Sequence, residues 1–166
     1  MFTSIKDFLT RWSYENDSTV KLLANLTDKS LSQKVTPDGR TLGFIAWHIS
    51  QTIPEMLGKT GLKLDGPGEN EKCPESAEKI REAFKKASDS LVKLIETEWT
   101  DESLQVEDEM YGDKWKRGMT LTGLVMHQAH HRGQMTVLMR QAGLKIPGIY
   151  GPSKEEWEAM GMPAME

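Results

Sequence analysis

Four stretches of this chain repeat apolar side chains at intervals of three and four residues, which is the period of an amphipathic helix. The stretches run from about residue 4 to 27, from Thr41 to Gly58, from Ser76 to about Trp99, and from Thr120 to about Ala142. Little strand signal lies between them. Because such helices bury their apolar faces against one another, the pattern predicts an all-α fold, most economically an antiparallel four-helix bundle.

Three connecting segments carry further predictions. Residues 60 to 75 are rich in Gly, Pro and charged side chains. A connection of this length predicts a loop that covers a site or contacts another subunit. Residues 101 to 118, with Gly112 in their middle, fit a short hairpin and an extended loop equally well. Residues 153 to 160 predict a short helical turn after the fourth long helix.

Size and charge exclude several classes of protein. The 166 residues predict one domain over 1–166, and the net charge of -4 without a basic stripe argues against a nucleic-acid partner. No apolar run approaches the roughly 20 residues that span a bilayer, and Lys6 and Asp7 interrupt the N-terminal apolar stretch, unlike a secretory signal. Cys73 is the only cysteine, which indicates a reducing compartment. We therefore expect a cytoplasmic protein with no membrane partner.

Three of the four histidines fall at positions that could close a metal site. His127 and His131 are one turn apart on the fourth predicted helix, only about 40° around from one another, with His131 inside the apolar stripe and His127 at its edge. His48 borders the apolar face of the second predicted helix. His130 lies about 60° to the other side of His127, away from the stripe. Helical geometry thus favours His48, His127 and His131 as the inward set.

This spacing alone leaves two interpretations open. A histidine beside an apolar face is commonly a structural, hydrogen-bonded residue, whereas three imidazoles can hold a divalent ion and leave a position open for water or substrate. Zinc, nickel, copper and iron(II) all suit such ligands. A zincin-type metalloprotease is excluded, because Gln128 follows His127 where that motif requires glutamate.

The sequence around these histidines resembles a known family. The strings Thr41-Leu-Gly-Phe-Ile-Ala-Trp-His48-Ile, His127-Gln-Ala-His-His131-Arg-Gly-Gln134 and Gly143-Leu-Lys-Ile-Pro are similar to those of the DinB family, which is related to the YfiT-like metal-dependent hydrolases. The resemblance covers nearly the whole chain.

The resemblance implies a four-helix bundle with a long crossover loop, one divalent metal ion that is commonly nickel or zinc, and a homodimer. The family's ligand positions correspond to His48, His127 and His131, the same three that helical geometry selects. His130, Arg132 and Gln134 belong to the same motif, and we expect them to support the ligands or to bind substrate.

Function within the family varies, and three hypotheses follow. Similar proteins include thiol S-transferases that use bacillithiol, mycothiol or glutathione, so the leading hypothesis is a transferase that acts on electrophilic small molecules. The alternatives are a metal-dependent hydrolase and a non-catalytic, stress-associated binding protein. No carboxylate stands in the histidine motif to serve as general base, which disfavours hydrolysis, although Glu55 could reach the groove.

Three neighbouring residues have two interpretations each, and a fourth has one. Arg132 either orients an acidic group of thiol or substrate, or forms a surface ion pair with a nearby glutamate. Gln134 either hydrogen-bonds a ligand or is solvated, and Trp47 packs under a loop or at a dimer contact. Gly133 costs about 1 kcal/mol relative to alanine inside a helix. We therefore expect a neighbouring helix to approach the backbone there.

Overall fold

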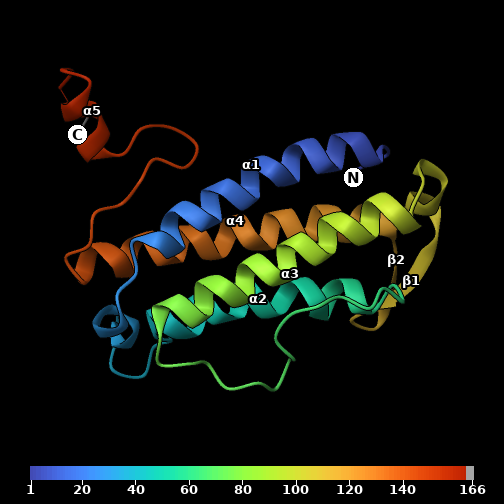
Figure 1. Ribbon diagram of the computed structural model, residues 1–166, viewed down its shortest axis with the longest axis horizontal. Helices are drawn as coiled ribbons and strands as arrows, with labels where there is room; N and C mark the ends of the chain where they lie inside the picture. Colours follow the sequence, from blue (N-terminus) through green and yellow to red (C-terminus); the bar gives the residue numbers. More distant parts are fainter. Residues whose placement is uncertain (164–166) are drawn as a thin grey trace.

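The computed structural model describes residues 1–163 and contains four long helices packed as one bundle (Figure 1). The helices are α1 (Ile5–Ala24), α2 (Leu42–Gly58), α3 (Ala77–Glu98) and α4 (Arg117–Gln141). Both α1 and α2 pack against α3 and α4, which places α1 diagonally opposite α2. The predicted all-α four-helix bundle is confirmed.

The crossover loop makes α2 and α3 parallel, which the periodicity did not predict. In Figure 1, α2 and α3 run the same way, and α1 and α4 run the opposite way. A helix of the length of α2 spans about 25 Å. Residues 59–76 return over that distance along the outside of the bundle before α3 begins. The simple antiparallel order is therefore wrong at this one junction, because the segment is long enough to cross over rather than turn.

The first three long helices begin where a capping side chain is available. Ser4, Thr41 and Ser76 each adopt an extended backbone and accept a hydrogen bond from the amide three residues later. Such caps contribute about 1 kcal/mol each and satisfy an amide that has no partner inside the helix. α4 has no side-chain cap and starts at Arg117, directly after a strand. The helix thus begins three residues before the predicted Thr120.

The core lies between the four helices and is mostly apolar, with a few buried polar side chains that include Glu15 and Arg132. Burying each large side chain contributes roughly 1.5–3 kcal/mol. Among the fully buried core residues are Phe8, Trp12, Leu22, Leu23, Leu42, Ile49, Ile53, Leu57, Ile80, Phe84, Leu91, Leu121 and Leu124.

A short hairpin occupies the segment before α4. The 3-10 helix η2 (Asp101–Gln105) leads into β1 (Glu107–Met110), which pairs antiparallel with β2 (Asp113–Lys116). The turn residues Tyr111 and Gly112 both have positive φ, 54° and 86°, as a two-residue type I′ turn requires. Of the two open possibilities for this segment, the hairpin is therefore the one observed.

Smaller elements complete the described chain. The 3-10 helix η1 (Asp28–Ser32) joins α1 to α2, and α5 (Lys154–Ala159) forms the predicted helical turn near the C-terminus. None of the helices described within residues 1–163 is long and apolar enough to cross a membrane.

Candidate metal centre

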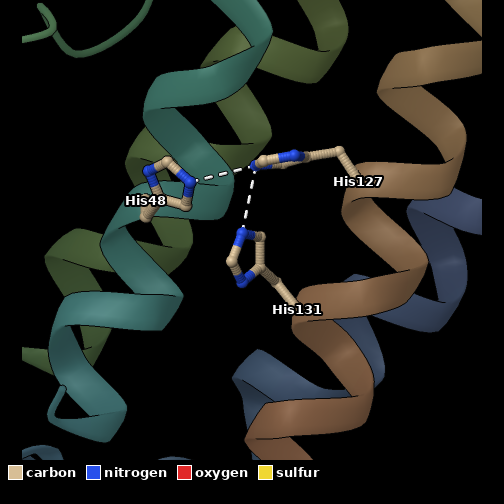
Figure 2. A group of neighbouring side chains, drawn as sticks. All are labelled: His48, His127 and His131. Carbon is tan, nitrogen blue, oxygen red and sulfur yellow. Dashed lines mark hydrogen bonds between the residues drawn. The ribbon is translucent and has the colours of Figure 1, made fainter. Parts of the chain in front are cut away.

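His48 on α2 and the pair His127 and His131 on α4 point toward one another where these two helices pack (Figure 2). The Nε2 atom of His127 lies 3.0 Å from Nε2 of His48 and 3.0 Å from Nε2 of His131. One ligand atom from each histidine lies within 4.8 Å of the others. The structure thus brings together the three histidines that the sequence singled out.

The donor set fits a divalent ion. Two imidazole nitrogens bound to one zinc ion at about 2.0–2.1 Å lie roughly 3.3 Å apart in tetrahedral geometry. The observed separations of 3.0 Å are close to that value. Three nitrogen atoms with no carboxylate or thiolate among them could hold one divalent ion and leave a position for another ligand.

Burial keeps these imidazoles in the neutral form that can bind a metal ion. Burial, with help from His131, His127 and Arg40, lowers the pKa of His48 to about 4. Burial also lowers the pKa values of His127 and His131. All three rings are therefore neutral near pH 7, and a cation need not displace protons to bind them.

Gln134 orients one of the three rings. Its Oε1 lies 2.7 Å from Nδ1 of His131, so the Nδ1–H donates to the amide and Nε2 keeps its lone pair for the cluster. This is the arrangement by which neighbouring groups fix the tautomer of metal-binding histidines. The amide nitrogen of Gln134 lies 3.1 Å from Nε2 of His130, which is exposed and outside the cluster. His130 therefore occupies the rim, where helical geometry placed it.

Arg132 does not face the histidine cluster. Its side chain is only 1% exposed and forms an ion pair with Glu15 on α1. Its guanidinium also donates to the Thr19 hydroxyl at 2.9 Å and to the Tyr150 phenol oxygen. A glutamate partner was one of the two interpretations, but the pair is buried rather than on the surface. Arg132 holds α4 to α1, and its contacts indicate no direct role in substrate binding.

A cavity of about 430 Å³ opens beside the histidines. It is bounded by α2, the crossover loop, the hairpin and α4, and its lining residues are His48, Gln51, Thr52, Glu55, Met56, Glu69, Tyr111, Trp115, Gly123 and His127. Glu55 therefore reaches the groove, as its position on the second helix allowed. Tyr111, Trp115 and Glu69 were missed, because no sequence pattern links a hairpin and a loop to two distant helices.

The crossover loop is fixed against α2 next to this cavity. The Gln51 amide donates to the backbone oxygens of Gly68 at 2.7 Å and Glu71 at 3.1 Å, and the Trp47 indole donates to Glu71 at 2.9 Å. Trp47 thus packs under the loop, one of its two predicted positions. Because Glu69 lines the cavity, the loop covers a site, as its length suggested.

Two further residues near the centre differ from expectation. Arg40, which precedes α2, lies close enough to lower the pKa values of both His48 and His131, and no sequence pattern singled it out. A Cβ atom added at Gly133 would meet nothing within 4 Å, so the predicted close approach of a helix there is wrong.

Comparisons with known proteins agree with this architecture. A family model described as the DinB family matches residues 1–165. The uncharacterized protein YrdA of Bacillus subtilis (strain 168) is 46% identical over 164 residues, which cover 99% of this chain and 98% of that protein.

Solved structures show the same fold. A DinB-like protein from Bacillus cereus ATCC 10987 superposes with a TM-score of 0.88 at 45% identity, over 90% of this chain and 100% of that one. A DinB-like protein from Bacillus subtilis has a TM-score of 0.68 at 17% identity, over 86% and 97% of the two chains, and shows the fold alone.

Proposed function

The chain belongs to the DinB family, and from its histidine centre we propose that it is a metal-dependent enzyme that transfers a low-molecular-weight thiol to an electrophilic small molecule. The observation that carries this proposal is the convergence of three Nε2 atoms from His48, His127 and His131 at the edge of a cavity. Nickel and zinc are the ions we expect. Imidazole nitrogens suit both.

A divalent ion at this centre would supply Lewis acidity that keeps a thiol in its thiolate form. The transfer then forms a bond between sulfur and an electrophilic carbon, the leaving group departs with its electron pair, and the thiol proton passes to solvent. The chain's own part is to hold reactants beside one another. His48 and His127 line the cavity in which the acceptor would lie, and Gln134 keeps the ring of His131 in place.

Arg40, rather than Arg132, is the cation placed to bind an acidic group of the thiol. Its guanidinium lies over the Phe44 ring at 5.1 Å and acts on His48 and His131 through its charge. A planar guanidinium binds a carboxylate through two parallel hydrogen bonds. Arg132 is already paired with the buried carboxylate of Glu15. Arg40 is not among the residues that line the cavity, and we propose that it binds the thiol's carboxylate.

The second candidate is a metal-dependent hydrolase, and Glu55 is the observation that favours it. A carboxylate in the cavity could accept a proton from water. However, its two oxygens already interact with the Tyr111 hydroxyl at 2.7 Å and with Lys59 at 3.5 Å. Both partners occupy the carboxylate oxygens that would have to accept the proton. Transfer from a thiol needs no such base once the thiolate has formed, so we rank it first.

The test is a transfer assay with defined thiols. Protein loaded with zinc or with nickel is incubated with monochlorobimane and, in turn, bacillithiol, mycothiol and glutathione, and the fluorescent adduct is followed. We expect one thiol to react faster with loaded protein than with metal-free protein, and His48→Ala to abolish the difference. No acceleration with any thiol would contradict the transferase proposal and leave the hydrolase and the non-catalytic binding protein.

Two broader expectations accompany the proposal. We propose that the protein acts in the cytoplasm, because its single cysteine suits a reducing compartment. We also propose that it is a homodimer, as the family resemblance implied. The molecular mass in solution, measured by light scattering, tests the second expectation.

A further inference from the structure

The cavity beside the histidine centre has walls of two different kinds. His48 and His127 form part of its lining, and the apolar surfaces of Met56 and Trp115 form another part. Glu55 and Glu69 bring two carboxylates into the same lining, from α2 and from the crossover loop. A ligand that matches this lining must therefore carry both an apolar surface and a positive charge.

The aromatic part of the wall comes from the hairpin. Tyr111 and Trp115 lie edge to face, with ring centroids 5.8 Å apart, and the Tyr111 hydroxyl donates to Glu55 at 2.7 Å. Tyr111 has a φ of 54°. Residues other than glycine adopt this left-handed backbone conformation only at a cost in free energy. This strained turn holds an aromatic ring at the rim of the cavity, next to a carboxylate. Aromatic faces beside carboxylates favour cations.

The two carboxylates in the lining have no cationic side chain beside them within the lining itself. No lysine or arginine stands among the described residues that line the cavity. Lys59 pairs with Glu55 at 3.5 Å and lies 5.3 Å from the Tyr111 ring centroid, so it offsets one carboxylate. Within residues 1–163 the carboxylate of Glu69 forms no ion pair or side-chain hydrogen bond. Glu69 is exposed at the rim, so its carboxylate is free to contact a cationic ligand.

Gly123 keeps the cavity open on the α4 side. It lies one turn before His127, and a Cβ atom there would be 3.3 Å from the Trp115 ring and 3.6 Å from the Met56 methyl. Glycine inside a helix costs about 1 kcal/mol relative to alanine. Its position explains why a space remains between the hairpin and the histidines.

From these features we infer that the cavity binds a small molecule with an apolar or aromatic body and a protonated amine. The amine lies by Glu69 and Glu55, and the body packs against Trp115, Met56 and the open face of Gly123. The other end of the molecule then points at His48 and His127. This inference rests on the proposed function in one respect, since it assigns the ligand as a substrate of the same centre.

Binding of a matched ligand pair tests the inference without any transfer reaction. Benzylamine and benzyl alcohol have nearly the same shape, but only the amine is charged at pH 7. Their dissociation constants are measured by calorimetry with metal-free and with zinc-loaded protein. We expect benzylamine to bind about threefold to tenfold more tightly, the size expected for a partly exposed ion pair with an aromatic contribution.

Three variants locate the effect. In the double variant Glu55→Gln and Glu69→Gln the preference for the amine should disappear, whereas Glu82→Gln, a glutamate on α3 outside the cavity, should keep it. Gly123→Leu should weaken both ligands while thermal melting shows that the protein is folded. Equal binding of amine and alcohol, or a preference that persists in the double variant, would overturn the inference.

The outcomes separate this inference from the proposed function. Amine preference without thiol transfer would support the cavity's selectivity and contradict the transferase. Thiol transfer without amine preference would contradict the selectivity alone.

Discussion

The Oε1 atom of Gln134 lies 2.7 Å from Nδ1 of His131 and so aims the Nε2 of that ring at His127. Removing such a supporting partner typically lowers metal affinity by about 10- to 100-fold. We predict a loss of that size for zinc in Gln134→Ala, measured by competition with a chelating dye. Gln134→Glu, which still accepts from Nδ1, should bind nearly as well as the parent protein.

The matched control for this prediction is Gln141→Ala, an exposed glutamine at the end of the same helix. It should leave zinc affinity unchanged. If Gln134→Ala also left it unchanged, the hydrogen bond to His131 would have no part in binding the ion.

Arg132 and Glu15 form a buried ion pair that joins α4 to α1. Removing one member of such a pair leaves an unpaired buried charge, at a cost of about 3–5 kcal/mol. We predict that Arg132→Met lowers the free energy of unfolding in urea by that amount. Arg140→Met breaks an exposed pair with Glu155 and should cost less than about 1 kcal/mol. Equal losses in the two variants would contradict the assignment of Arg132 as a buried structural residue.

Gly133 and Gly118 both lie inside α4, but they have opposite surroundings. A Cβ at Gly133 would meet nothing within 4 Å, whereas one at Gly118 would overlap the backbone carbonyl of Phe2. We predict that Gly133→Ala raises the free energy of unfolding by about 0.5–1 kcal/mol through helix propensity. Gly118→Ala should lower it. Urea denaturation measures both, and a destabilising Gly133→Ala would show that this face of α4 is not open.

The lowered pKa of His48 predicts how metal-free protein responds to acid. Its pKa is about 4 in the folded chain, mainly through burial, against an ordinary value of 6.5. Between these values the unfolded chain binds more protons than the folded chain, so stability falls as pH is lowered from about 6.5 toward 4. Urea denaturation across that range should show the fall. His48→Leu should reduce its slope, and an unchanged slope would contradict the assigned cause.

The sequence predicted the helical fold, the family and the histidines that meet, for identifiable physical reasons. Apolar side chains at helical spacing specify which face is buried, so the spacing placed His48, His127 and His131 at the edge of the core. The same reasoning placed His130 outside it. These positions depend only on the helix period and on burial.

Other features depend on tertiary contacts that periodicity does not encode. The partner of Arg132 lies on α1, more than a hundred residues away in sequence, so its burial could not be read from α4 alone. The hairpin required a left-handed conformation at Tyr111, a residue type that gives no turn signal of its own. The cavity combines residues from four separate segments, and only Glu55 among its carboxylates was foreseen.

The central claim is that His48, His127 and His131 bind one divalent ion. The most direct test is the metal content of purified protein after reconstitution and desalting, determined by mass spectrometry for the parent protein, His48→Ala, His131→Ala and His130→Ala. We predict about one ion per chain in the parent protein and in His130→Ala, and loss of the ion in the other two variants. Metal retained by both His48→Ala and His131→Ala, or lost in His130→Ala, would contradict the three-histidine centre.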